Sequence, residues 1–138
     1  MNKLVRFGVS LEESLLRAFD KHINLKNYNS RSEAIRDLIR EGFVKKEWQE
    51  DKEVAGTITI VYNHHQRELV NKLTDIQHAY YNLIVSSHHV HLDHHNCLES
   101  IVVKGRASKI TELTDRLKSS RGVIFGDLTM ATMAEELG

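Results

Sequence analysis

The sequence predicts an α+β protein built from two parts with different patterns. In the first part, an alternating stretch at residues 4–11 precedes two amphipathic helical stretches. In the second part, stretches typical of strands and helices follow in the order strand, helix, strand, strand, helix, strand. A charged segment lies between the two parts, so we place the domains at residues 1–50 and 51–138.

The composition is that of a globular protein with a real core, since 41% of its residues are hydrophobic and 28% are charged. The formal net charge is zero, so nothing global indicates a nucleic-acid or membrane partner. A single cysteine excludes an internal disulfide and fits a reducing compartment. No apolar run approaches the roughly 20 residues needed to cross a bilayer, and MNKLVRFGVSL is too short and polar for a secretory signal. We therefore expect a cytoplasmic protein.

The first element expected is a short, half-buried strand at residues 4–11, because polar and apolar residues alternate there. One face carries Val5, Phe7, Val9 and Leu11. The opposite face carries Leu4, Arg6, Gly8 and Ser10.

Two helices are expected next, at about residues 12–24 and 31–46. Ser30 begins the sequence S-R-S-E, which is a capping box that ends at Glu33. This strand, helix and helix form a thin core, and a lone strand leaves two open edges. Pairing two copies strand to strand would solve both problems by making a two-stranded antiparallel ribbon on four helices.

Such a unit resembles the ribbon-helix-helix DNA-binding domain, and NYNSRSEAIRDLIREG is similar to the second helix of that family. The resemblance implies that Arg6, Gly8 and Ser10 face base edges in the major groove. It also implies that the start of the second helix, with Arg31 and Ser32, faces a phosphate. Gly8 departs from the pattern, because related proteins often place a polar base-reading residue there. From pattern alone, an amphipathic helical hairpin with a solvated face is equally consistent.

The second part follows a charged segment, residues 45–56, which we interpret as the end of the second helix running into a linker. The strands expected in this part are residues 57–62, 81–92, 97–105 and 123–131. The helices expected are residues 66–80 and 108–120. Their order is that of the ferredoxin-like βαββαβ fold, with four antiparallel strands and two helices on one face.

The most unusual stretch is HHVHLDHHNC, residues 88–97, which holds five of the nine histidines and the only cysteine. Strand alternation places His89 and His91 on one face, and Cys97 begins the returning strand with Glu99 on its own face. Two imidazoles and a thiolate then converge at one end of a hairpin, which indicates a metal site. The other interpretation is an exposed polar turn, including His88, His94 and His95, beside a buried and inert cysteine.

His78 is the best candidate for a fourth ligand. It lies nine positions after Leu69, so at 100° per residue it points about 180° away from the core stripe of its helix. It could therefore reach a site in another subunit more easily than its own hairpin. On periodicity alone, a solvated helix histidine remains the simpler interpretation.

Taken together, the strand-helix-helix start, the sequence QHAYYNLIVSSHHVHLDHHNCLESIVVKG and the βαββαβ remainder resemble the nickel-responsive transcriptional regulators of the NikR family. The resemblance implies an ACT-like C-terminal domain that forms the core of a homotetramer with four nickel sites at its interface. His89, His91 and Cys97 of one subunit and His78 of its neighbour would hold one square-planar Ni(II) per subunit. Imidazole and thiolate in tetragonal geometry suit Ni(II) or Cu(II).

The resemblance also implies supporting roles and a function. Glu99 would belong to the hydrogen-bond network behind the metal, and Tyr62 would lie near it. Glu33 and Asp37 would hold a second cation between the domains, although Glu33 also completes the capping box. The implied function is nickel-dependent binding to inverted-repeat operator half-sites, with repression of nickel-uptake genes and no enzymatic activity.

Two rival functions stay open from the residues alone. A metalloenzyme could use Cys97 and the histidines, but catalytic zinc keeps an open position and a full set of four protein ligands does not. An antitoxin-like ribbon-helix-helix protein would bind its operator without metal, and the structured second domain argues against it.

Overall fold

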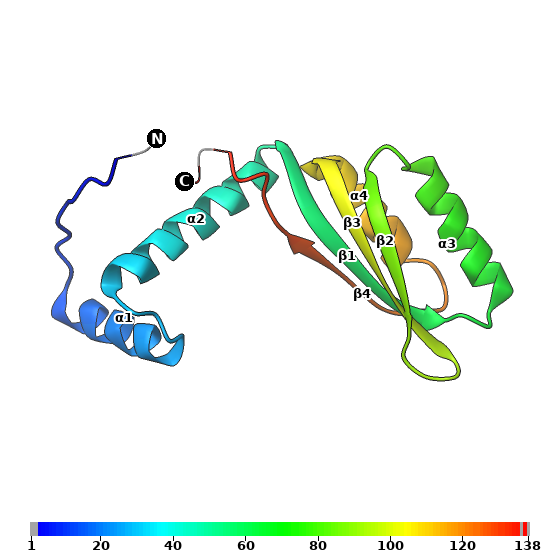
Figure 1. Cartoon of the computed structure of the whole chain (residues 1–138), viewed down its shortest axis with the longest axis horizontal. Coiled ribbons are helices and arrows are strands. Elements are labelled where there is room, and N and C mark those ends of the chain that lie inside the picture. The colour runs from blue at the N-terminus through cyan, green and yellow to red at the C-terminus, as the bar shows by residue number, and fades with distance from the viewer. Residues whose placement is uncertain (1–2, 136, 138) are drawn as a thin grey trace. The chain divides into compact units, whose positions relative to one another are not determined.

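The computed structural model describes residues 3–135 and Leu137. They fall into two compact units, Met1–Phe43 with Glu136–Gly138, and Val44–Glu135. The elements are α1 (Glu13–Leu25), α2 (Arg31–Gln49), β1 (Glu53–Asn63), α3 (Arg67–Ala79), β2 (Ile84–His91), β3 (Asn96–Arg106), α4 (Ala107–Lys118) and β4 (Val123–Met130) (Figure 1).

The strand expected at residues 4–11 is not formed within one chain, because residues 3–12 have no regular structure. The apolar face of this segment is exposed, with Val5 82% and Phe7 72% accessible. A strand requires hydrogen bonds to a neighbouring strand. The sheet of the described residues contains only β1 to β4, so this segment finds no partner there.

The two helices of the first unit begin close to their expected positions. Ile23 of α1 and Ala34 of α2 are buried. One of the two bonds of the capping box is confirmed: Ser30 Oγ accepts a hydrogen bond of 3.2 Å from the Glu33 N–H. The Glu33 carboxylate accepts one of 3.2 Å from the backbone N–H of Asn29, so the side chain reaches back one residue beyond the cap.

The prediction of a linker within residues 45–56 was wrong for most of that segment. Helix α2 continues to Gln49, and β1 already begins at Glu53. The helix is prolonged because Trp48 is buried in the second unit, where its indole Nε1 donates a hydrogen bond of 2.9 Å to the Ala131 carbonyl. Asp51, with a φ of 56°, makes the sharp turn between helix and strand.

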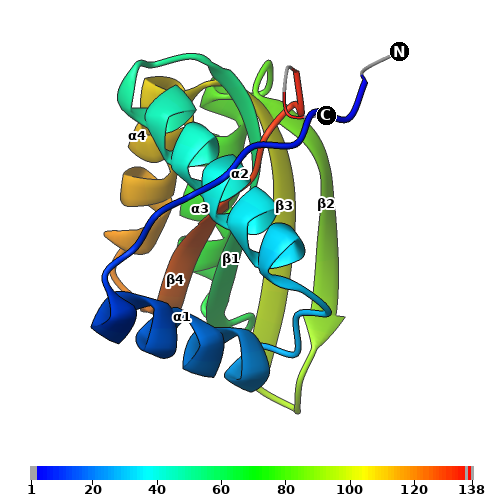
Figure 2. The same cartoon turned by 90° about the vertical axis from the view of Figure 1, so that its left-hand side faces the viewer.

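The second unit is a four-stranded sheet in the order β2-β3-β1-β4, with every neighbouring pair antiparallel. Figure 2 displays the strands side by side in this order. This arrangement confirms the predicted ferredoxin-like βαββαβ fold. None of the helices described is long and apolar enough to cross a membrane.

Helices α3 and α4 cover one face of the sheet, and the core lies between them and the strands. The largest fully buried apolar side chains are Ile58, Ile60, Leu73, Ile101, Ile110, Leu113 and Leu117. Burying each such side chain stabilises the fold by about 1.5–3 kcal/mol. Cys97 and Glu99 lie on this same covered face of β3, so the candidate metal residues begin inside the core.

Candidate metal centre

The hairpin of β2 and β3 decides which histidines share a face. In its antiparallel register, His89 lies opposite Glu99 and His91 lies opposite Cys97. Residues directly opposite each other in such a pair place their side chains on the same face. The face assignment predicted from strand alternation is therefore confirmed for all four residues.

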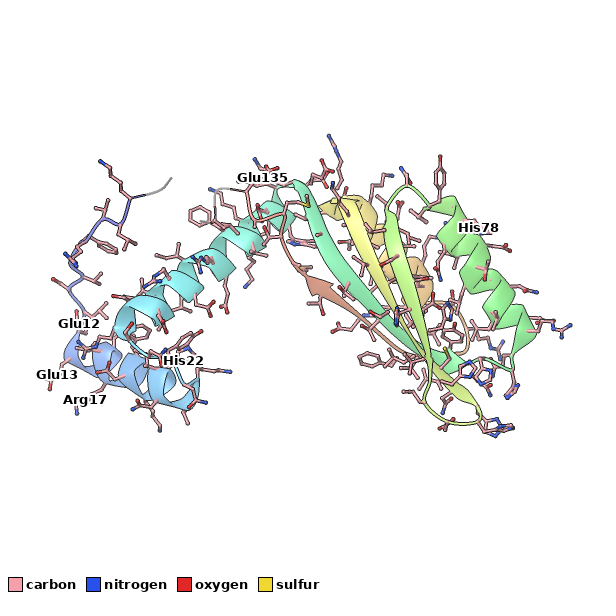
Figure 3. All side chains as sticks on the ribbon, in the orientation of Figure 1. Glu12, Glu13, Arg17, His22, His78 and Glu135 are labelled. Carbon is pink, nitrogen blue, oxygen red and sulfur yellow. The ribbon has the colours of Figure 1, made fainter. Side chains whose placement is uncertain are left out.

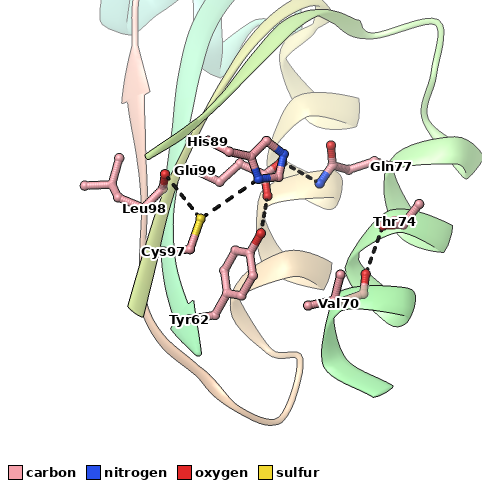
Figure 4. A network of polar contacts seen from close by, with 8 residues as sticks. All are labelled: Tyr62, Val70, Thr74, Gln77, His89, Cys97, Leu98 and Glu99. Atoms are coloured by element: carbon pink, nitrogen blue, oxygen red, sulfur yellow. Dashed lines mark hydrogen bonds and ion pairs between the residues drawn. The ribbon is translucent and has the colours of Figure 1, made fainter. Parts of the chain in front are cut away.

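Cys97 and His89 come close together on this face. The Cys97 Sγ lies 3.9 Å from Nδ1 of His89 (Figure 4). The cysteine is only 1% exposed, whereas the His89 side chain is 56% exposed. The buried sulfur and the exposed imidazole are therefore close enough together for one metal ion to contact both.

A buried carboxylate orients His89 from the other side. Glu99 is 1% exposed, and its Oε1 accepts a hydrogen bond of 2.8 Å from the Tyr62 hydroxyl. Its Oε2 accepts one of 3.0 Å from the Gln77 amide and lies 3.4 Å from Nε2 of His89 (Figure 4). Burial, followed by the bond to Glu99, raises the pKa of Tyr62 well above its usual range, so the phenol remains a donor.

Gln77 is the member of this network that the sequence did not reveal. It lies on α3 beside His78 and donates across to β3. No periodicity or spacing marks it, because its partner is 22 positions away in the chain. Only the packing of α3 on the sheet brings the two side chains together.

His78 occupies the last turn of α3 and is exposed, as its helical position predicts (Figure 3). However, it does not face wholly away from its own hairpin. It borders a pocket of about 200 Å³ that is also lined by His89, Glu99 and Tyr62. A residue that points away from the core stripe of its helix can therefore still reach the rim of its own sheet when it lies near the helix end.

His91 shares the face of Cys97, but its ring lies against another histidine. It stacks on His64, with ring centroids 4.4 Å apart and planes 4° apart. Within the described part of the chain, His89, His91 and Cys97 do not have their ligand atoms all within 4.8 Å of one another. Burial and the neighbouring charges of His65 and His91 lower the pKa of His64, which favours its neutral form.

The residues expected to contact DNA lie in the first unit. Arg6, Gly8 and Ser10 are exposed on the segment that precedes α1, and Ser32 is exposed on the first turn of α2. Arg31 is already paired within the chain. Its guanidinium donates two hydrogen bonds of 2.9 Å to the Asp20 carboxylate, and this pairing lowers the pKa of Asp20.

The two carboxylates expected to hold a second cation have partners within the first unit. Glu33 accepts a hydrogen bond from the backbone N–H of Asn29. Asp37, one turn further along α2, accepts a hydrogen bond from the Tyr28 hydroxyl. This bond raises the pKa of Tyr28 to about 12. Both carboxylates thus have a structural use in the chain itself.

Comparison with known families adds what the geometry cannot. Residues 5–46 match the profile of the ribbon-helix-helix proteins of the copG family. Residues 55–131 match the profile described as the NikR C terminal nickel binding domain. The chain belongs to the nickel-responsive regulator family. Its second unit is therefore a nickel-binding domain of the NikR type, and its first unit is a DNA-binding domain of the ribbon-helix-helix type.

Relatives of the same family match over essentially their whole length. A protein of Pyrococcus furiosus is 58% identical over 97% of this chain and 98% of its own. A protein of Syntrophus aciditrophicus is 53% identical over 98% of both chains. Both are provisionally named nickel-responsive regulator. The predicted resemblance is thus confirmed over the full chain.

A solved structure supports the fold alone. An uncharacterized protein of Thermotoga maritima, TM1266, aligns with 56% of this chain and 96% of its own at a TM-score of 0.52 and 15% identity. At this identity the likeness concerns the arrangement of the backbone and carries nothing about binding.

The donors of the second unit fit the ion of the family. Cys97 is a free thiol beside an imidazole of His89, with a buried carboxylate behind that imidazole. Thiolate and imidazole ligands suit Ni(II), Cu(II) and Zn(II), and an orienting carboxylate is typical behind a ligating histidine. The residues present are therefore chemically suited to hold nickel.

Proposed function

We propose that this chain is a nickel-dependent DNA-binding regulator that represses genes for nickel uptake. The observation that carries the proposal is the contact between Cys97 and His89, backed by Glu99, in a chain that also has a ribbon-helix-helix unit. A thiolate and an imidazole supply the metal sensor, and the first unit supplies the response. No second function has a comparable observation in its favour.

The proposed ligands are His89, His91 and Cys97 of one subunit and His78 of a neighbouring subunit, with one Ni(II) per subunit. The contact at 3.9 Å between Cys97 and His89 supports the first pair. His91 lies opposite Cys97 on the same face, and because its side chain is exposed it can turn from His64 toward the sulfur. The exposure of His78 leaves it accessible to a neighbour. When bound, the ion would serve as a cross-link, because its ligands would come from two subunits.

The proposed assembly is a homotetramer. The face of the sheet opposite α3 and α4 supports it, because apolar side chains remain exposed there. Val90 is 46% exposed, Val102 39% and Phe125 51%, each on a different strand. Burying such side chains against another copy would be favourable.

The proposed DNA-binding surface also requires two copies. The exposed apolar residues Val5 and Phe7 support pairing of residues 4–11 from two chains, because pairing would bury them and satisfy the backbone. Arg6, Gly8 and Ser10 would then face base edges, and the first turn of α2, with Arg31 and Ser32, would face a phosphate. Arg31 would do so while held by Asp20.

Ligation by residues of two subunits would couple the metal site to the ribbons. His78 lies at the end of α3, so fixing it to the hairpin of a neighbour would restrict how two subunits are arranged. That arrangement would set the spacing of two ribbons on inverted-repeat half-sites. Operator DNA would in turn tighten nickel binding by the same factor, because coupling is reciprocal. Glu33 and Asp37 would add a second cation only by giving up their present partners.

The test is DNA binding with and without nickel. Operator sequences would first be selected from random DNA with the nickel-loaded protein. Fluorescence anisotropy would then measure the affinity of the selected DNA for the apo protein, the nickel protein and the zinc protein. We expect nickel to tighten operator binding by about 1–3 kcal/mol or more, and zinc to do so less. Equal affinity of the apo and nickel forms would refute the proposal.

A further inference from the structure

A second group of metal-binding side chains lies outside the centre described above. His65 follows β1, and His94 and His95 lie in the turn between β2 and β3 (Figure 1). Each offers one ring nitrogen, and these three atoms all lie within 4.8 Å of one another. All three side chains are exposed, so an ion can reach them from solvent.

The two loops that carry these histidines are fastened to each other. The backbone N–H of His64 donates a hydrogen bond of 3.0 Å to the His95 carbonyl. The Asp93 carboxylate accepts bonds of 2.8 Å from the backbone N–H groups of His95 and Asn96, which fixes the turn. The three imidazoles are therefore already gathered, so little loop ordering opposes the binding of an ion.

One ring nitrogen of His65 is already held by a backbone carbonyl. Its Nε2 lies 2.9 Å from the backbone carbonyl of His94. A carbonyl can only accept, so Nε2 carries the hydrogen and the lone pair is on Nδ1. Histidines that bind metals commonly donate their other ring N–H to a carbonyl or carboxylate in this way.

We propose that His65, His94 and His95 form a second metal site that takes a divalent transition ion favouring imidazole, with Cu(II) bound most tightly and Ni(II) and Zn(II) less so. Imidazole suits these ions, and the order follows their general affinity for nitrogen ligands. Metal–nitrogen bonds of about 2.1 Å allow two ligands to be at most roughly 4.2 Å apart. The exposed rings need only a small rotation to meet that limit.

This site differs in chemistry from the centre at Cys97. It has three imidazoles, no thiolate, and coordination positions left to water, so its ion should exchange quickly. It shares no ligand with the proposed set of His78, His89, His91 and Cys97. The inference does not depend on the proposed regulatory function, because it concerns binding of the ion alone.

The experiment uses the full chain with Cys97→Ala and His89→Ala, which disable the first centre. Cu(II) is added alone, its electron paramagnetic resonance spectrum is recorded, and the equivalents bound are measured by equilibrium dialysis, because the ion should exchange quickly. We expect one equivalent per chain with nitrogen splitting from imidazoles. His65→Gln, His94→Gln and His95→Gln together, on that background, should abolish it. His88→Gln, an exposed histidine on the same hairpin, should leave it unchanged.

A second measurement needs no variant. In the wild-type chain, Cu(II) should protect His65, His94 and His95 from modification by diethylpyrocarbonate, with His22 as the unprotected reference. Copper bound equally after the triple substitution, no copper bound on the disabled background, or absence of protection at these three histidines would each overturn the proposal. Neither measurement involves DNA, so their failure would leave the regulatory proposal intact.

Discussion

The Tyr62 hydroxyl on β1 donates a hydrogen bond of 2.8 Å to the Glu99 carboxylate on β3, and both side chains are buried. Tyr62 is the register partner of Cys97, so its bond to Glu99 runs diagonally across the sheet. The bond thus links Tyr62, which lies opposite Cys97, to the carboxylate that contacts His89. Leaving a buried carboxylate oxygen without such a donor costs stability.

Tyr62→Phe should destabilise the second unit by about 1–3 kcal/mol, because it leaves Glu99 Oε1 without its donor in the core. Urea denaturation followed by circular dichroism would measure the change. Tyr81→Phe is the matched control, since Tyr81 is 77% exposed. If both variants unfolded at the same urea concentration as the parent, the hydroxyl would have no stabilising role.

Cys97→Ala should abolish the thiolate-to-metal charge-transfer absorption of the nickel-loaded protein. The sulfur is the only thiol of the chain, so no other residue can supply this band. Nickel binding by the parent should release protons and weaken as pH falls, because the thiolate and neutral imidazoles must be deprotonated to bind. An unchanged spectrum in the variant, with His88→Ala as the control, would exclude Cys97 as a ligand.

Mixing two variants tests whether the nickel site is shared between subunits. A tetramer made only of His78→Ala chains, or only of His89→Ala chains, lacks one ligand at every site. In a mixed tetramer, the His78→Ala chain supplies an intact hairpin and the His89→Ala chain supplies an intact His78. Co-refolding should therefore restore part of the nickel spectrum and part of the nickel-dependent DNA binding.

The outcome shows whether His78 binds the nickel of a neighbouring subunit or that of its own chain. Because His78 borders the same pocket as His89 of its own chain, a site within one chain is the alternative. In that case each site would keep its own lesion, and verified mixed tetramers would recover nothing.

Arg6→Ala should weaken binding to a selected operator by about 1–3 kcal/mol, the worth of a bidentate contact to guanine. Nickel binding and assembly should be unaffected, because Arg6 lies outside the second unit. Arg17→Ala is the control, since Arg17 is exposed on α1 and paired with Glu13. If anisotropy titrations gave the two variants the same operator affinity, Arg6 would not contact the bases.

Tyr28 should titrate near pH 12 in the folded protein, because its hydrogen bond to Asp37 raises its pKa to about 12. Since the folded pKa exceeds the unfolded value of about 10, this bond should stabilise the first unit fully below pH ~10. The contribution should then be lost as pH rises through about 12. Absorbance of the tyrosinate band would follow the ionisation, and Asp37→Asn should move it to lower pH.

Much of the fold could be predicted because each pattern is local. The capping box at Ser30 needs only four adjacent residues, and alternation alone placed His89, His91, Cys97 and Glu99 on one face. Order along the chain sufficed for the βαββαβ arrangement, since few ways exist to connect such strands compactly. Recognising nickel, however, required the family, because imidazole and thiolate donors alone do not choose among late transition ions.

The errors occurred where a distant partner decides the local structure. Residues 4–11 alternate like a strand, yet without a neighbouring strand their backbone stays irregular. The segment around Trp48 is charged like a linker, but the indole is buried and bonded to Ala131, 83 positions away, and so the helix continues.

The sequence by itself thus determined the elements, their order, the face of each strand residue and the donor types available for a metal. Tertiary structure alone decided which donors meet which partners. It placed Gln77 and Tyr62 on Glu99, stacked His91 on His64, and gathered His65 with His94 and His95. The physical reason is the separation along the chain. Periodicity and capping act over a few residues, whereas these contacts join side chains that only the packing of α3 and the register of the sheet bring within reach.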